Sequence, residues 1–190
     1  MTRRGFMQGM ALAGVAAGMP LRGWTAEQPR FKTKLQKALI APVADDATCE
    51  RIAKAGFPGV ELTKKDITLE DAQKGRAIAE KHGVKIHSFM AGWADFGNAD
   101  AEARRRSIED IKRLIRVTAA YGADAMLLVP CLRMGGTIPK PTQFKIVYDP
   151  ATCQIKSVVE GDNAPFADYI ATHNRASDLA RAGVEELIPV

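Results

Sequence analysis

Polar side chains that could bind a small polar molecule gather in two strand-like runs. Glu61 lies in the first, His87 and Ser88 lie in the second, and Trp93 follows in a polar stretch. A carboxylate accepts hydrogen bonds from hydroxyl groups, an imidazole exchanges a proton near neutral pH, and an indole offers an apolar wall. We therefore take Glu61, His87, Ser88 and Trp93 as the candidate substrate-binding residues. The sequence singles out no catalytic residue and no metal ligand.

Each candidate also has a purely structural interpretation, which the sequence leaves open. His87, the strongest of them, could be a core or rim histidine that the backbone satisfies. Glu61 could pair with a neighbouring lysine such as Lys64, and Trp93 could simply anchor a loop.

The three cysteines, Cys49, Cys131 and Cys153, form no C-x-x-C pair, so the sequence carries no zinc or redox motif of that kind. Cys131 with Cys153 is the one pair worth testing as a disulfide, and buried free thiols are the alternative.

Strand-like and helix-like segments alternate from Lys37 onward. Thr68, followed by Asp71, is a helix-start signature, and glycines at 56, 83 and 122 are expected to end helices. The expected strands are 37–41, 59–62, 84–88 and 124–129; the expected helices are about 45–55, 68–82 and 100–121; residues 90–98 are expected to form a loop. Such alternation predicts parallel βαβ units and an α/β fold.

The pattern is interrupted after the fourth strand. Two alternating runs flank a turn at 149–152, which predicts a β-hairpin insertion over residues 143–160. A last helix is expected from about Asp168, with Leu179, Val184, Leu187 and Ile188 on its apolar face. The helical pattern runs on to Val190, so we interpret the chain as an unfinished structure.

The first 26 residues have the pattern of a signal segment. Arg3 and Arg4 precede Phe6 and a weakly apolar, glycine-rich run that is short for a membrane span. The string from Thr2 to Met7 resembles the twin-arginine export signal, which implies export of a folded protein to the periplasm. An amphipathic first helix is the alternative. We expect no stable membrane insertion once the segment is removed, and a folded domain over 34–190.

The net charge gives little support to nucleic-acid binding. The formal value is +5, from 27 Lys and Arg against 22 acids, and three of the arginines lie in the first 26 residues. Without those three, 24 basic residues face 22 acids, which leaves about +2. We therefore expect no nucleic-acid partner.

Three motifs, in their order and spacing, resemble the xylose isomerase-like barrels that include sugar phosphate isomerases and epimerases. The motifs are Ala55–Leu62 around the second strand, Ile86–Met90 at the third and Ala120–Asp124 before the fourth. The resemblance implies the first four βα units of a (β/α)8 TIM barrel. The functional face of such a barrel is formed by the carboxyl ends of the strands, where the resemblance would place Glu61, His87, Ser88 and the loop that carries Trp93. It also implies a divalent metal (Mn, Mg, Co or Zn) whose ligands follow the fifth and later strands, and so lie outside this chain.

The resemblance implies a metal-dependent isomerase or epimerase that moves a proton between adjacent carbons of a small-molecule sugar. In its full-length form the protein is then an enzyme, and this half alone is expected to be inactive. A non-catalytic, exported carbohydrate-binding barrel is the alternative, because export removes the protein from phosphorylated sugars. A related abasic-site endonuclease would need a basic DNA groove, which the charge does not support. Whether the protein forms a homo-oligomer is left open by the sequence.

Overall fold

The structure, a computed structural model, describes residues 35–130 and 135–190. The expected signal segment over 1–26, with Arg3, Arg4 and Phe6, lies outside the described residues, and so does Cys131. Among the cysteines that are described, Cys49 is buried and Cys153 is exposed, and both are free thiols. The described part of the chain contains no helix that is both long and apolar enough to cross a membrane.

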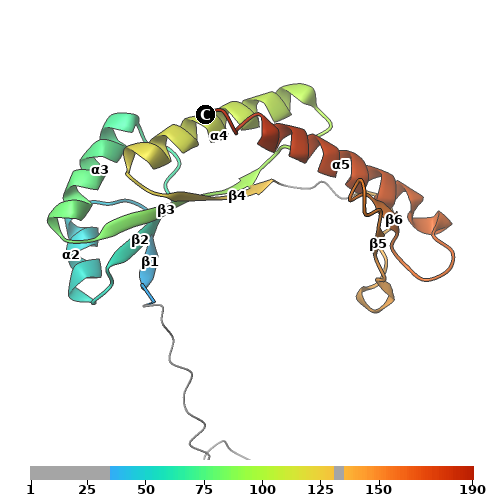
Figure 1. Cartoon of the computed structure of the whole chain (residues 1–190), viewed down its shortest axis with the longest axis horizontal. Coiled ribbons are helices and arrows are strands. Elements are labelled where there is room, and N and C mark those ends of the chain that lie inside the picture. Colours follow the sequence, from blue (N-terminus) through green and yellow to red (C-terminus); the bar gives the residue numbers. More distant parts are fainter. Residues whose placement is uncertain (1–34, 131–134) are drawn as a thin grey trace, which may run out of the picture. The chain divides into compact units, whose positions relative to one another are not determined.

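Four parallel strands form the central sheet, in the order β1-β2-β3-β4 (Figure 1). They are β1 (Ala38–Ala41), β2 (Gly59–Leu62), β3 (Lys85–Ala94) and β4 (Ala125–Pro130). Each strand pairs in parallel with the next, so each connection must cross over the sheet, and a helix lies in each connection. The expected α/β fold with parallel βαβ units is confirmed.

The three crossover helices begin where the capping residues allow. They are α2 (Asp46–Lys54), α3 (Leu69–Lys81) and α4 (Ala101–Ala120). The Thr68 hydroxyl accepts a hydrogen bond from the backbone N–H of Asp71 at 3.0 Å, which confirms the predicted helix start. The carboxylates of Asp45 and Asp100 cap α2 and α4 in the same way.

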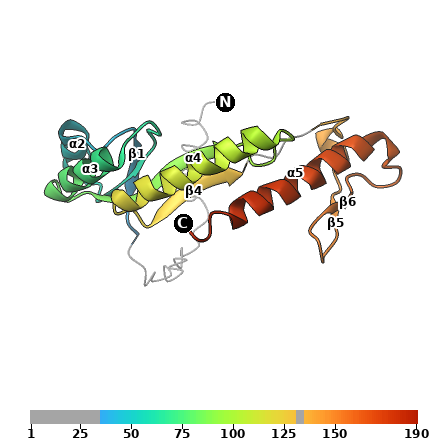
Figure 2. The same ribbon diagram turned by 90° about the horizontal axis from the view of Figure 1, so that it is seen from above.

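The core lies between these helices and one face of the sheet. Helix α4 runs along β3 and β4 in both views (Figures 1 and 2). Phe89 of β3 is fully buried, and its ring stacks on that of Tyr121 at a centroid distance of 6.3 Å. Val60 and Leu62 of β2 face the same core, as does Leu114 of α4.

Strand β3 is longer than the sequence predicts. The region expected to be a polar loop, 90–98, continues as strand to Ala94, and Trp93 and Ala94 pair with Val129 and Pro130 of β4. Trp93 is therefore a strand residue, and the loop prediction was wrong for residues 90–94. The register shifts between Met90 and Gly92, and such a bulge hides the regular alternation that would have marked a strand.

The predicted hairpin is confirmed, although its strands are short. β5 (Val147–Tyr148) pairs antiparallel with β6 (Ile155–Ser157), between the 3-10 turns η1 (Pro141–Gln143) and η2 (Ala164–Phe166). Asn174 of the last helix, α5 (Ala167–Glu185), accepts from the N–H of Ile155 at 2.7 Å and donates to its carbonyl at 2.9 Å. This amide side chain ties the hairpin to α5.

The predicted apolar face of α5 was wrong in part. Leu187 packs against the core, but Val184 and Ile188 are exposed, and the buried positions of the helix are Tyr169, Ala176, Ala180 and Gly183. A Cβ at position 183 would lie 2.9 Å from Cδ2 of Phe96, so the small residue permits the close approach. The helix also ends at Glu185, short of Val190.

We predict that Phe89→Ala destabilises the fold by about 3–5 kcal/mol, because it removes a fully buried ring from the contact between sheet and α4. Urea unfolding followed by circular dichroism measures the change. Leu69→Ala, at a position 48% exposed, is the matched control and should change stability by less than about 1 kcal/mol. Equal effects of the two substitutions would contradict the described core.

We also predict that the hairpin turn loosens in acid. The Lys156 ammonium and then the backbone N–H groups of Ala151 and Thr152 lower the pKa of Asp149 from 3.8 to about 2. A carboxyl group whose pKa is lowered in the folded state stabilises that state at pH values above its ordinary pKa of 3.8. This stabilisation disappears as the pH falls toward 2. Amide hydrogen exchange at Ala151 and Thr152 should therefore accelerate over that range. Asp149→Asn should abolish the pH dependence, whereas Glu160→Gln in the same hairpin should leave it intact.

Candidate functional site

Glu61 and Ser88 are brought together across two neighbouring strands. They are partners in the β2–β3 register, and the Ser88 hydroxyl donates a hydrogen bond to Oε1 of Glu61 at 3.0 Å. Because Val60 and Leu62 face the helices, Glu61 points to the opposite face of the sheet, which we call the open face. Ser88 is only 6% exposed, whereas Glu61 is half-buried. Glu61 is therefore the accessible member of the pair, and Ser88 is placed to orient it.

His87 lies close to this pair but turns toward the amino ends of the strands. The register shifts between Val60 and Glu61, so β3 carries an extra residue at His87. The His87 ring packs near Gly59 and lines a cavity of about 380 Å³ together with Lys37 and Lys85. Lys37 directly precedes β1, and Lys85 is the first residue of β3. The expectation had placed His87 at the carboxyl ends of the strands. It is the third residue of a ten-residue strand, because β3 extends beyond its predicted end.

Trp93 stands apart from the other three candidates. It lies near the carboxyl end of β3 with 73% of its surface exposed. Trp93 lies five positions after Ser88, which corresponds to about 16 Å along an extended strand. The structure thus joins Glu61, Ser88 and His87 in one region and leaves Trp93 at the carboxyl rim.

A second cavity at the carboxyl end of β3 contains a residue that the sequence did not single out. It has a volume of about 400 Å³ and lies between residues 97–99, which follow β3, and Thr172, Arg175 and Ala176 of α5. Within the described ranges no ion pair or hydrogen bond engages the Arg175 guanidinium, which could therefore bind hydroxyl or phosphate oxygens. No sequence motif marks this position, because Arg175 reaches the rim only through the packing of α5.

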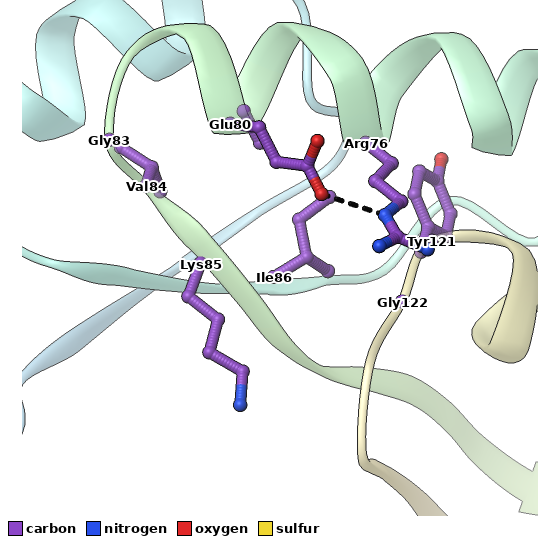
Figure 3. A pocket seen from close by; sticks show the side chains of 9 residues that line it. Arg76, Glu80, Gly83, Val84, Lys85, Ile86, Tyr121 and Gly122 are labelled. Atoms are coloured by element: carbon purple, nitrogen blue, oxygen red, sulfur yellow. Dashed lines mark hydrogen bonds and ion pairs between the residues drawn. The ribbon is translucent and has the colours of Figure 1, made fainter.

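The pocket in Figure 3 lies at the other end of the sheet. Its volume is about 410 Å³, and residues from the end of α3, the start of β3 and the end of α4 line it. Arg76 is already paired with Glu80 at 2.8 Å and lies against Gly122, where a Cβ would come within 3.0 Å of Nε. Desolvation raises the pKa of the Tyr121 hydroxyl, which disfavours its ionised form. These charges are satisfied within the protein, so we assign the pocket no binding role.

Charged residues also meet at the amino ends of the strands. The Lys85 ammonium donates to the Asp124 carboxylate just before β4, and this contact lowers the pKa of Asp124. Both side chains are more than half exposed, so the pair contributes little to stability.

The described residues do not form a metal centre. Across 35–130 and 135–190, the His, Cys, Asp and Glu side chains make no group of three that could hold an ion. The hydrogen-bond partner of Glu61 among the described residues is the Ser88 hydroxyl rather than a second carboxylate or an imidazole. We therefore derive no catalytic step through a metal from these side chains.

The chain belongs to the xylose isomerase-like TIM barrel family, whose model matches residues 49–150, more than half of its length. That range takes in β2, β3 and β4, and the sheet is the corresponding part of such a barrel. No protein of curated function matches the chain significantly.

Solved structures of similar fold have low sequence identity. A putative sugar phosphate isomerase/epimerase from Anabaena variabilis is 16% identical with a TM-score of 0.50, over 81% of this chain and 50% of that one. The 3-keto-D-glucoside 4-epimerase from E. coli is 14% identical with a TM-score of 0.48, over 82% of this chain and 52% of its own. The chain thus spans about half the length of these proteins.

We predict that the 190-residue chain binds Mn²⁺ only weakly, because its described carboxylates and imidazoles are not clustered. Isothermal titration calorimetry should give a dissociation constant above about 100 µM, which corresponds to a binding free energy weaker than about 5.5 kcal/mol. Submicromolar binding that is lost in Glu61→Gln would contradict this description of the site.

Proposed function

We propose that this chain supplies the first four βα units of a sugar isomerase or epimerase, which moves a proton between adjacent carbons of its substrate. The observation that carries the proposal is the family match over residues 49–150. The Anabaena structure, whose title names a putative sugar phosphate isomerase/epimerase, supports the fold. The divalent metal, Mn, Mg, Co or Zn, and the carboxylates that move the proton belong in this proposal to residues outside the chain.

Within the proposal, Glu61 binds a sugar hydroxyl on the open face. One of its carboxylate oxygens accepts from Ser88, and the other remains to accept a hydrogen bond from substrate. Ser88, being buried, acts through Glu61 and does not touch the sugar. Trp93 and Arg175 stand at the carboxyl end of β3, where barrel enzymes bind their substrates, and Trp93 offers an apolar wall there.

A non-catalytic, exported carbohydrate-binding protein is the second candidate. The observation that favours it is the twin-arginine pattern from Thr2 to Met7, because an exported protein does not meet phosphorylated sugars. Such a protein would use Glu61 and Trp93 in the same way but would move no proton.

We predict that Glu61→Gln weakens the binding of a ketohexose by about ten- to a hundredfold, since a charge-assisted hydrogen bond contributes roughly 1.5–3 kcal/mol. Ser88→Ala should weaken binding by a few-fold, because it releases the orientation of Glu61 without removing a sugar contact. Saturation-transfer NMR with the 190-residue chain gives the affinities. Glu70→Gln, an exposed carboxylate paired with Lys74 on α3, is the control and should bind like the parent chain.

Solvent deuterium separates the two candidates. The 190-residue chain should leave the carbon-bound hydrogens of the sugar unexchanged in D2O with Mn²⁺. If the coding sequence continues beyond Val190, an isomerase or epimerase made from the longer chain should exchange one of them, whereas a binding protein should exchange none. A chain that binds no sugar in any form would remove both candidates.

We propose in addition that the protein is exported to the periplasm. Replacing Arg3 and Arg4 together by Lys should retain the protein in the cytoplasm, because the twin-arginine signal requires both guanidinium groups. Fractionation followed by immunoblotting measures the distribution. The matched control Arg22→Lys should be exported like the parent, and export of the double variant would reject this type of signal.

A further inference from the structure

The hairpin insertion contains a small sheet of its own. β5 and β6 pair antiparallel in a two-stranded sheet that is separate from the four-stranded central sheet (Figure 1). Such a sheet has two outer edges, and the backbone N–H and C=O groups along an open edge can pair with a further strand. The structure treats the two edges of this hairpin differently.

The outer edge on the β6 side is already satisfied by side chains. The amide of Asn174 bonds both the N–H and the C=O of Ile155, at 2.7 and 2.9 Å. Just beyond β6, Oδ1 of Asn163 accepts from the N–H groups of Val158 and Val159 at 2.8 and 3.2 Å. This side of the hairpin therefore offers no place for another strand.

The outer edge on the β5 side is open. The backbone N–H groups of Lys145 and Asp149 both donate to carbonyls on the β6 side, at 2.8 and 2.7 Å. Because the direction of these groups alternates along a strand, Ile146 and Tyr148 turn their backbone N–H and C=O groups away from β6. Within the ranges that the structure describes, no strand pairs with that side of β5.

The side chains along this edge are apolar and exposed. Ile146 is 39% exposed, Val147 48% and Tyr148 51%, and all three are residue types with high strand propensity. Edge strands commonly carry charges or proline, which prevent pairing with other chains. Three consecutive exposed apolar residues do the opposite, and such a patch marks a site of association.

The edge of β5 is complementary to itself. Two copies related by a two-fold axis between their Val147 residues place Ile146 of one copy opposite Tyr148 of the other, in antiparallel order. Both residues face outward, so their backbone groups can exchange hydrogen bonds in both directions. The same register places Lys145 opposite Asp149 at each end of the pairing, and opposite charges across two strands stabilise a sheet.

The ion pairs within each hairpin are compatible with that register. Lys145 contacts Glu160 at 3.0 Å, and Asp149 contacts Lys156 at 2.8 Å. Across the pairing the charges of these side chains therefore alternate in sign, and no like charges are placed opposite each other.

We propose that two copies of the chain associate through β5, in antiparallel pairing about a two-fold axis, so that the two hairpins form one continuous sheet. The outer edges of the joined sheet are the β6 sides, which Asn174 and Asn163 block, so the association stops at two copies. The hairpin is an insertion after β4, and its pairing leaves the barrel sheet of each copy unchanged. This inference concerns the association of the chain and does not rest on the proposed activity.

Sedimentation equilibrium of the 190-residue chain tests the proposal. We expect the mass to rise from 20.6 kDa toward twice that value with concentration. The dissociation constant should lie between about 1 and 100 µM, because the contact is small. Ile146→Pro should raise it at least about tenfold, since it removes an outward N–H and leaves the bonds to β6 in place. Val147→Lys should do the same, because it sets two like charges directly opposite each other.

Two matched controls separate this edge from general effects of proline or added charge. Leu69→Pro changes a leucine that is 48% exposed at the first position of α3, where proline is tolerated, and Val184→Lys changes a valine that is 38% exposed on α5. Both controls should dimerise like the parent. Hydrogen exchange at the amide of Asp149, which bonds to the β6 side, should stay protected in all four variants and so show a folded hairpin.

A parent chain that stays monomeric up to about 500 µM would overturn the proposal, since five times the largest expected dissociation constant leaves most of the chain dimeric. So would a dimer that Ile146→Pro and Val147→Lys both leave intact, or one that the two control substitutions dissociate equally.

Discussion

The parallel pairing of β3 with both β2 and β4 is the constraint on which the rest of the structure depends. Parallel neighbours can be joined only by a crossover, so this pairing requires a helix in each connection. The helices bury Val60, Leu62 and Phe89 on one face of the sheet. The residues that alternate with them are thereby directed to the other face, and Glu61 is one of these.

Two irregularities in β3 decide how the candidate residues are distributed. The shift between Val60 and Glu61 brings both His87 and Ser88 to the neighbourhood of the open face, with Ser88 bonded to Glu61. The shift between Met90 and Gly92 lets the strand continue past Trp93 to Ala94. One long strand therefore carries a histidine at its amino end, a serine that orients a carboxylate, and an exposed tryptophan at the carboxyl rim.

The same sheet leaves the chain with surface that a barrel would normally enclose. Membership of the xylose isomerase-like TIM barrel family explains why the open face carries Ile40 and Leu127, which would be interior positions in a closed ring. The sugar-binding proposal concerns this face. Its residues are Glu61 and Ser88, which are joined by a hydrogen bond.

Much of the fold followed from local signals. Thr68 with Asp71 set the start of α3, glycines at 56, 83 and 122 followed the helix ends, and alternation gave the parallel sheet, because capping and backbone conformation act over a few residues. The length of β3 could not be predicted in this way, since a bulge masks the pattern and pairing with β4 alone extends the strand. The buried face of α5 was missed because Gly183 and Ala180 are buried by their fit to distant residues such as Phe96 rather than by hydrophobicity. The sequence by itself determined the class of fold and the candidate residues. Only the tertiary structure decided that Ser88 is buried beneath Glu61, that His87 faces the amino ends of the strands and that Arg175 reaches the carboxyl rim. Those placements depend on contacts between segments far apart in the chain, which no local pattern contains.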